Sequence, residues 1–141
     1  MTIRIRNIEL EDYNEYTELL KQLTIVGESN IENFHKFHNS LNNNHNVILI
    51  LLDDKIVGCG TYLIEKKVIH NFGLVAHIED VVVDSKCRGY GIGKKIMNKL
   101  IEIAQDRKCY KIILNCDIQN IIFYEKCGFI KKEYQMIKYL N

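Results

Sequence analysis

The sequence predicts one mixed α/β domain, an α+β arrangement in which helices cover both faces of a mixed sheet. Three observations support this prediction. The 141 residues correspond to one domain at about 100–200 residues per domain. Strand-like segments alternate with segments whose apolar residues recur every three or four positions. Hairpin signals dominate the first half and a strand–helix repeat the second, so we expect residues 1–141 to form a single domain.

The first part of the chain is predicted to form one strand and two helices. Residues 2–6 alternate apolar and polar side chains, as a half-buried strand does. The next apolar residues recur at helical spacing and predict a helix: Leu10, Tyr13, Leu20 and Leu23. Ser29-Asn30-Ile31-Glu32 matches a capping box and predicts the start of a second helix. One face of that helix would carry Ile31, Phe34, Phe37 and Leu41.

The rest of the chain is predicted to alternate strands and helices around a glycine-rich turn. Val47–Leu52 is typical of a buried strand, and Asp53-Asp54-Lys55 predicts a hairpin turn. The remaining strands are predicted over 56–65, 77–83 and 111–116, with an extended end over 129–140. A long helix carries Ile96, Leu100, Ile103 and Ala104, and a short one covers 120–126. The predicted order is therefore β-α-α-β-β-β-α-β-α-β.

Composition excludes several classes of protein. Lys and Arg number 19 against 18 acidic residues, a net charge of +1, which argues against binding to nucleic acid or a membrane surface through bulk positive charge. The longest aliphatic run, Val47–Leu52, is far shorter than the ~20 residues of a membrane-spanning helix. The N-terminus lacks the apolar centre of a signal peptide.

The cysteines and histidines predict neither a disulfide framework nor a metal site. The five cysteines are an odd set without a CxxC pair: Cys59, Cys87, Cys109, Cys116 and Cys127. We therefore expect reduced thiols and a cytoplasmic protein. His35 and His38 have helical spacing, but no ligand cluster accompanies them, so we expect no metal.

The strongest local signal is a buried strand that leads into three alternate glycines, Gly89, Gly91 and Gly93, at the start of a helix. Glycines let a ligand approach the backbone, and helix N-terminal N–H groups bind phosphate oxygens. Arg88, Lys94 and Lys95 would add positive charge there. A tight turn alone would need only one glycine, so the pattern predicts phosphate binding.

Two common phosphate-binding loops fit this pattern poorly. A Walker loop needs Ser or Thr at the position of Lys95. A Rossmann fingerprint needs GxGxxG after the first strand, whereas this spacing is GxGxG and only about fifty residues follow. Asp117 does stand where an acidic ribose ligand of a dinucleotide site would be expected, so that reading stays open as an alternative.

Arg88-x-x-Gly91-x-Gly93 resembles the acetyl-CoA loop of the GNAT N-acetyltransferase superfamily, and the segment Asn120 to Phe129 resembles its second hallmark. Further segments are similar to the eukaryotic-type glucosamine-6-phosphate N-acetyltransferase family. These are His77–Val83, Cys109–Cys116, Phe123–Phe129, and Gln22-Leu23-Thr24 with Gly27. The resemblance covers nearly the whole chain and implies the GNAT fold, in which two central strands splay apart around acetyl-CoA.

The resemblance implies two groups of ligand-binding residues. Acetyl-CoA would contact Val81, Val82, Val83, Arg88, Gly89, Tyr90, Gly91, Ile92, Gly93, Asn115, Asn120 and Tyr124. The amino-sugar phosphate would contact Thr24, Lys67, Val68, Ile69, His70, Glu79, Asp80, Val81, Tyr110, Lys111 and Lys138. Carboxylates and hydroxyls suit the sugar, and Lys67, His70 and Lys111 suit its phosphate.

Three residues are expected to act in catalysis by direct attack of the amine in a ternary complex. The backbone carbonyl of Asn115 would orient the 2-amine, and Tyr124 would give a proton or hydrogen bond to the CoA thiolate. Strand N–H groups would polarise the thioester carbonyl. Glu79 is the third candidate because an unpaired carboxylate beside an apolar strand is costly, although a structural hydrogen bond would also explain it.

The chain departs from the family at two positions. Asn115 stands where relatives often have a carboxylate. A role of its backbone would survive this change, but a role of its side chain would not. Lys138 replaces an arginine that reaches the neighbouring subunit's phosphate pocket, and lysine lacks the bidentate fork. The resemblance implies a homodimer with C-terminal strands at the interface, to which residues 133–140 would contribute.

The expected activity is acetylation of glucosamine 6-phosphate, a step that feeds UDP-N-acetylglucosamine synthesis. Two alternatives remain. The first is a GNAT enzyme that acetylates another amine, such as a polyamine or a protein N-terminus. The second is a CoA-binding module without turnover, which would bind acetyl-CoA and release no thiol.

Overall fold

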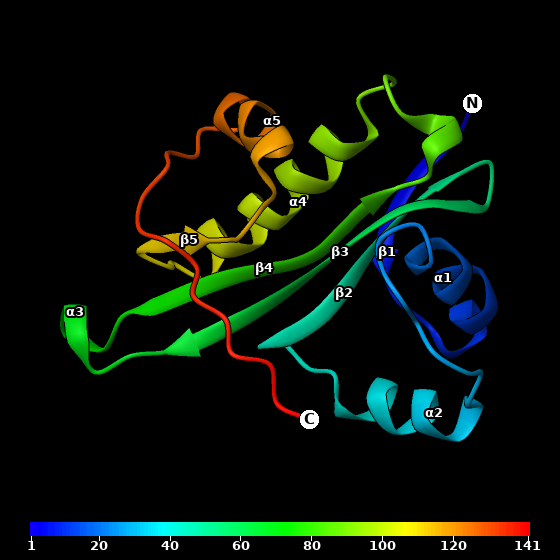
Figure 1. The fold of residues 1–141 in the computed structure, drawn as a ribbon, viewed down its shortest axis with the longest axis horizontal. Helices are drawn as coiled ribbons and strands as arrows, with labels where there is room; N and C mark the ends of the chain where they lie inside the picture. Colours follow the sequence, from blue (N-terminus) through cyan, green and yellow to red (C-terminus); the bar gives the residue numbers. More distant parts are fainter.

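The five strands of the sheet lie side by side in the order in which they occur along the chain (Figure 1). They are β1 (Ile3–Asn7), β2 (His45–Leu52), β3 (Lys55–Lys66), β4 (Leu74–Val83) and β5 (Lys111–Ile113). The first four strands are antiparallel to their neighbours, and β5 is parallel to β4. The computed structural model, which describes residues 1–141, therefore confirms the predicted mixed sheet.

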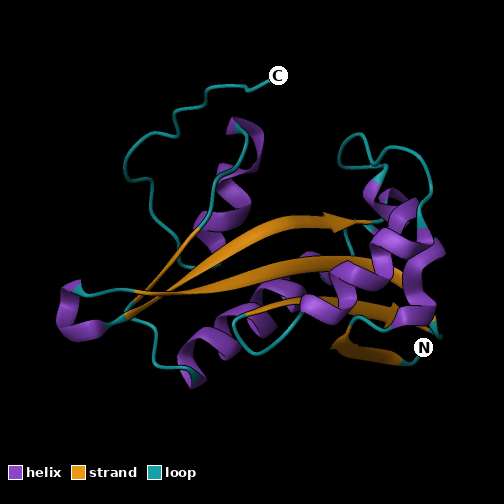
Figure 2. Cartoon of the chain, turned by 90° about the horizontal axis from the view of Figure 1, so that it is seen from below, coloured by secondary structure: helices purple, strands orange, loops and turns teal.

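Helices lie on both faces of this sheet (Figures 1 and 2). The longer ones are α1 (Tyr13–Leu20), α2 (Ile31–Ser40) and α4 (Ile92–Asp106), and the shorter ones are α3 (Ile69–Phe72) and α5 (Ile121–Lys126). Single 3-10 turns precede α1, α4 and α5 at Leu10–Asp12, Ser85–Cys87 and Ile118–Asn120. No helix is both long and apolar enough to cross a membrane.

Two apolar cores form because both faces of the central strands are covered. In β2, Ile48 and Ile50 pack in the core under α4, whereas the alternate residues Leu49 and Leu51 pack in the core under α1 and α2. Alternation follows from the two-residue period of a strand. This burial on both faces explains why Val47–Leu52 contains no polar position, as its sequence predicts for a buried strand.

A β-bulge in β4 changes which face its residues meet. Glu79 pairs with Thr61 and Val82 with Cys59, so that two residues of β4, Asp80 and Val81, lie opposite the single Gly60. Asp80 has a φ of +49°. Ile78 packs in the core under α4, but Val82 packs in the core under α1. The extra residue therefore reverses the inward and outward positions beyond it.

The strands β4 and β5 separate after a short paired stretch. Only Val75, Ala76 and His77 pair with Lys111, Ile112 and Ile113. Strand β4 continues to Val83 without a strand partner on that side. This is the splayed pair that the resemblance implies, and it leaves the backbone edge of β4 free over residues 78–83.

Three details of the sequence prediction are wrong. The strand predicted over 111–116 ends at Ile113, because the chain there diverges from β4. The helix cap is Asn30, whose side chain accepts from the N–H of Asn33, rather than Ser29. The final strand implied by residues 129–140 is absent, because no strand of this chain pairs with it and residues 130–141 are exposed. Figure 2 shows this segment as a loop.

Candidate active site

The loop from Arg88 to Gly93 ends in the first turn of α4. Its backbone N–H groups donate to no backbone carbonyl. Gly91 is the N-cap residue and has a φ of +76°, a conformation that residues with a Cβ rarely adopt. None of the N–H groups of residues 88–94 donates to a backbone carbonyl. Free N–H groups at the positive end of a 15-residue helix are suited to hold phosphate oxygens.

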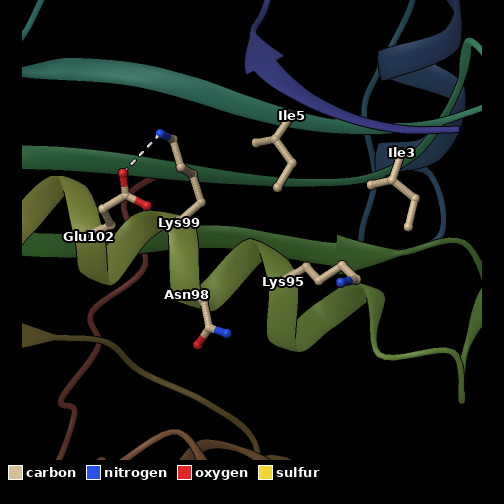
Figure 3. A pocket seen from close by; sticks show the side chains of 6 residues that line it. All are labelled: Ile3, Ile5, Lys95, Asn98, Lys99 and Glu102. Carbon is tan, nitrogen blue, oxygen red and sulfur yellow. Dashed lines mark hydrogen bonds and ion pairs between the residues drawn. The ribbon is translucent and has the colours of Figure 1, made fainter.

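The three cations near this loop do not all face the same way. Arg88 is exposed at the loop itself. Lys94 lies close enough to Cys127 to oppose the rise in the pKa of that thiol, whose main cause is burial. Lys95, however, lies in a groove of about 440 Å³ between α4 and the exposed edge of β1. Figure 3 shows it there, in the first turn of α4, with Ile3 and Ile5, so a contribution of Lys95 to the charge at the loop stays a prediction.

Close packing at Gly93 joins the glycine loop to the C-terminal helix. A Cβ at Gly93 would lie 3.1 Å from the ring of Phe123 in α5 and 3.5 Å from Val83 at the end of β4. The third glycine of the motif therefore serves helix packing, while Gly91 serves the turn. Strand β4, helix α4 and helix α5 consequently meet at one end of the splayed strands.

Tyr124 is half-buried in α5 and faces the region where β5 ends. Its ring packs edge-on against Phe123 and Phe129, with centroid distances of 5.0 and 6.1 Å. Burial raises the pKa of its hydroxyl, and the nearby thiols of Cys116 and Cys127 raise it further. Tyr124 is therefore a protonated phenol at neutral pH, which is the state a proton donor needs.

Asn115 and Asn120 both lie in the segment that connects β5 to α5, near its two ends. Asn115 follows the last paired residue of β5 by two positions and is exposed, next to Cys116. Asn120 ends the 3-10 turn before α5, and its N–H donates to the carbonyl of Asp117. Neither side chain has a hydrogen-bond partner within the chain, so both remain free for a ligand.

A second group of predicted residues meets where β4 and β5 begin. The ring of His70 stacks on that of Tyr110, with centroids 4.2 Å apart and planes inclined by 26°. The ammonium of Lys111 lies 5.9 Å from the centre of the same Tyr110 ring. Three residues from two chain segments about 40 positions apart thus form one cationic and aromatic cluster.

Gly73 permits this stack. A Cβ at position 73 would lie 2.6 Å from the ring of Tyr110 and 2.9 Å from the backbone oxygen of His70. The backbone of α3 is also unusual, because His70, Asn71 and Phe72 all have φ between +52° and +58°. The tip between β3 and β4 is therefore shaped to bring His70 over Tyr110.

The other predicted residues of that tip have different surroundings. Lys67 forms an ion pair of 3.0 Å with Glu65, which also accepts a 2.8 Å hydrogen bond from His77. These two neighbours hold the pKa of Glu65 below its ordinary value, His77 having the larger effect. Val68 and Ile69 are exposed.

Glu79 and Asp80 are exposed carboxylates at the β4 bulge, and neither has an ion-pair partner. A hydrogen bond from the neighbouring strand β3 supports the backbone of Asp80: the thiol of Cys59 donates to its carbonyl oxygen at 3.6 Å. Burial raises the pKa of that thiol to about 12, although a backbone hydrogen bond from Val82 opposes the rise. The bulge thus presents two unpaired acids at the open edge of β4.

Two further predicted residues come from other segments of the chain. Thr24 is exposed in the loop between α1 and α2, where its N–H donates to the carbonyl of Leu20. Lys138 is exposed in the C-terminal segment and has no partner. The structure contains no group of three or more His, Cys, Asp or Glu side chains arranged for a metal ion.

The prediction from sequence missed the contacts that hold these parts in place. Gly73, Cys59 and the side chain of Gln22, which reaches Ser85, received no role. A local signal exists only for the turn at Asp84-Ser85-Lys86, which has an acidic cap residue directly after a strand. The contacts of Cys59 with Asp80, of Gly73 with Tyr110 and of Gln22 with Ser85 join residues at least 21 positions apart, and no local pattern marks them.

Comparison with known proteins agrees with this arrangement. Residues 4–129 match the family model described as the acetyltransferase (GNAT) family. The chain is 40% identical over 146 residues to glucosamine 6-phosphate N-acetyltransferase of Arabidopsis thaliana, which covers 99% of this chain and 98% of that protein. It is 38% identical over 143 residues to glucosamine 6-phosphate N-acetyltransferase 1 of Dictyostelium discoideum, at 98% and 91% coverage.

A solved structure gives the same result for the fold. The crystal structure of glucosamine-6-phosphate N-acetyltransferase from Arabidopsis thaliana superimposes with a TM-score of 0.95 and 39% identity, and the match covers all of both chains. The matched region includes the glycine loop, the splayed strands and α5. This chain therefore belongs to the acetyltransferase (GNAT) family.

Proposed function

We propose that this chain transfers the acetyl group of acetyl-CoA to the 2-amine of glucosamine 6-phosphate. The amine nitrogen forms a bond to the acetyl carbonyl carbon while the carbon–sulfur bond breaks. The amine loses a proton and the CoA thiolate gains one, so the products are N-acetylglucosamine 6-phosphate and CoA. The relatives named glucosamine 6-phosphate N-acetyltransferase match nearly the full chain, and they support this acceptor.

The observation that carries the proposal is the cluster of His70, Tyr110 and Lys111 at the start of the splayed strands. Two of these side chains provide N–H donors for a phosphate, and the exposed carboxylates of Glu79 and Asp80 lie farther along β4, toward the glycine loop. A sugar phosphate needs both kinds of group, because its hydroxyls donate to carboxylates while its phosphate accepts from cations. A simple amine would need no such cation cluster.

The residues proposed to bind acetyl-CoA lie at the opposite end of β4 and in the loop that follows it. Arg88, Gly89, Tyr90, Gly91, Ile92 and Gly93 supply free N–H groups for the pyrophosphate. The unpaired edge at Val81, Val82 and Val83 supplies backbone groups for the pantetheine arm. Asn120 lies at the start of α5, beside this path.

In the proposed mechanism, the chain orients the amine and supplies the final proton. The backbone carbonyl of Asn115 accepts from the attacking amine, and strand N–H groups stabilise the developing charge on the acetyl oxygen. Tyr124 gives its proton to the CoA thiolate, which its raised pKa permits throughout the neutral range. Glu79 accepts from the sugar and helps to align the amine.

The proposal also covers the oligomeric state of the protein and its cellular compartment. The exposed apolar residues of the C-terminal segment, including Tyr134, Met136 and Tyr139, support a homodimer in which this segment pairs with a second copy. Lys138 would then approach the partner's phosphate site. The five free cysteines favour a reducing, cytoplasmic setting, where the product would enter UDP-N-acetylglucosamine synthesis.

The test is direct detection of the product by mass spectrometry. The protein is mixed with acetyl-CoA and glucosamine 6-phosphate, and in a parallel reaction with unphosphorylated glucosamine. We expect the N-acetylated sugar phosphate in the first reaction and little product in the second. Binding of acetyl-CoA without product from either sugar would overturn the acceptor, and acetylation of both sugars at equal rates would overturn the phosphate site.

A further inference from the structure

Gln22 lies just after α1, at the start of the loop that carries Thr24. Its N–H donates to the carbonyl of Leu19, and the N–H groups of Leu23 and Thr24 both donate to the carbonyl of Leu20. Leu19 itself is buried in the core under α1 and α2. The backbone of Gln22 is therefore held at the end of α1, and its side chain extends from there.

The side chain of Gln22 spans 63 positions of sequence to the chain that follows β4. Its oxygen accepts from the N–H of Ser85 at 2.9 Å, and its Nε2 donates to Oδ1 of Asp84 at 3.4 Å. The same Asp84 oxygen accepts from the N–H of Lys86 at 3.0 Å. The N–H of Lys86 and the amide of Gln22 hold the pKa of the Asp84 carboxyl below its ordinary value.

This bridge joins the two ligand regions of the proposed enzyme. The 3-10 turn at Ser85–Cys87 leads directly into the loop at Arg88–Gly93. On the other side, Thr24 follows Gln22 by two residues, and the next anchor of its loop is Tyr13, whose hydroxyl contacts Ser29 and accepts from the N–H of Asn30. Between these two anchors, residues 25–28 have no side-chain hydrogen bonds, and Ile25 is 93% exposed.

We propose that Gln22 is a positioning residue that couples the acceptor loop at Thr24 to the acetyl-CoA loop at Arg88–Gly93. This inference rests on the proposed function, because it takes Thr24 as an acceptor contact. A ligand that orders one loop orders the turn at Ser85 through the amide, which reduces the ordering cost for the second ligand. The two ligands therefore bind with positive coupling.

An amide is suited to this position because it accepts from Ser85 and donates to Asp84 at the same time. A glutamate would keep the first contact but place a second carboxylate against Asp84. The same groove also carries Glu15, Glu18 and one cation, Lys55, so an added negative charge would meet other acids. Exchange of the two groups, with Gln22→Glu and Asp84→Asn together, restores one donor and keeps the net charge.

The experiment measures binding rather than turnover alone. CoA is titrated into the full chain by calorimetry, with and without saturating glucosamine 6-phosphate, for the wild type and three variants. The variants are Gln22→Ala, Gln22→Glu and the double exchange Gln22→Glu/Asp84→Asn. Gln105→Ala serves as the matched control, because Gln105 is exposed in α4 and its side chain has no hydrogen-bond partner.

We expect glucosamine 6-phosphate to tighten CoA binding by about threefold or more in the wild type and in Gln105→Ala. The two single variants at Gln22 should lose this effect, and their KM for the acceptor should rise about threefold to tenfold with a smaller change in kcat. The double exchange should recover at least half of the coupling, which a merely structural role would not require.

Two results would overturn the inference. Unchanged coupling in Gln22→Ala, even with a lower melting temperature, would show that Gln22 only stabilises the fold. If the wild type binds CoA but not glucosamine 6-phosphate, the proposed acceptor fails and the coupling fails with it. The two failures are distinguished by the wild type, because only the second abolishes its binding of the sugar phosphate.

Discussion

The thiol of Cys59 donates a 3.6 Å hydrogen bond to the carbonyl oxygen of Asp80, the residue whose φ of +49° forms the bulge of β4. A left-handed conformation costs an ordinary residue about 1–2 kcal/mol, so the bulge needs support from its surroundings. Cys59 is fully buried and belongs to the same core as Tyr16 and Val82. One buried thiol therefore helps to hold both carboxylates at the open strand edge.

We expect Cys59→Ala to destabilise the protein by about 1–2 kcal/mol, because it removes this hydrogen bond and leaves a small cavity. The free energy of unfolding is measured by urea denaturation. Cys116→Ala removes the same atoms from an exposed position and should change stability by less than about 0.5 kcal/mol. Equal effects of the two variants would contradict the role of Cys59 at the bulge.

Alkylation should distinguish the same two cysteines in the native protein. The thiol of Cys59 is buried and its pKa is raised to about 12, so almost none of it is thiolate at pH 8. Cys116 is exposed. Brief treatment with iodoacetamide and peptide mass spectrometry should therefore show modification at Cys116 first, and at Cys59 only after denaturation. Early modification of Cys59 would mean that the core under the bulge opens readily.

Tyr124→Phe should lower kcat about tenfold to a hundredfold with little change in either KM, because it removes the proposed proton donor and keeps the ring. The packing against Phe123 and Phe129 should survive. Tyr62→Phe is the matched control, since Tyr62 is also a buried phenol whose pKa is raised by burial. Similar losses of kcat in both variants would argue against a catalytic hydroxyl at Tyr124.

Two glycine substitutions should separate the ligand regions. Gly73→Ala places a Cβ 2.6 Å from Tyr110 and 2.9 Å from the oxygen of His70, so it should raise the KM for glucosamine 6-phosphate about tenfold. In Gly91→Ala the new Cβ meets no atom within 4 Å, but alanine at a φ of +76° costs about 1–2 kcal/mol of conformational energy. This strain should distort the loop and raise the KM for acetyl-CoA. Steady-state kinetics with each substrate varied in turn measures both KM values. A rise in the KM for acetyl-CoA in Gly73→Ala, or for glucosamine 6-phosphate in Gly91→Ala, would contradict the assignment.

Acid should weaken the N-terminal part of the fold through Asp12. Burial alone would raise the pKa of this carboxyl, but hydrogen bonds from Arg6 and the N–H of Glu9 outweigh burial and lower it below its ordinary value. The stability from this group is therefore complete above the unfolded pKa, about 3.9, and is lost as the pH falls through the lower folded value.

Asp12→Asn should consequently destabilise the protein by about 2 kcal/mol at pH 7, because Arg6 loses a charged acceptor. The difference from the wild type should narrow below about pH 3.9, where the wild-type carboxyl also becomes protonated. Urea denaturation at neutral and acid pH measures both effects. Glu18→Gln, which removes an exposed partner of Lys21, is the control, and a constant difference for Asp12→Asn at all pH values would refute the assignment.

Periodicity predicted most helices and strands correctly, because they depend on local spacing. The hairpin at Asp53-Asp54 formed as expected, with φ values of +49° and +65°, and the long helix follows the glycine loop as its apolar spacing indicates. The extended segment over 129–140 failed this test. Its apolar residues have the character of a strand, but a strand also needs a partner, and this chain offers none.

The sequence by itself determined the local features on which the two proposed ligand regions rest: the glycine loop that opens a helix, the adjacent acids Glu79 and Asp80 within an apolar strand, and the Tyr124 segment. Such features lie within a few residues of each other and follow from local backbone rules. Only the tertiary structure decided the bulge at Asp80, the stack of His70 on Tyr110 and the bridge from Gln22 to Ser85. Each of these joins residues that are distant along the chain, and their contact depends on how the sheet packs against its helices.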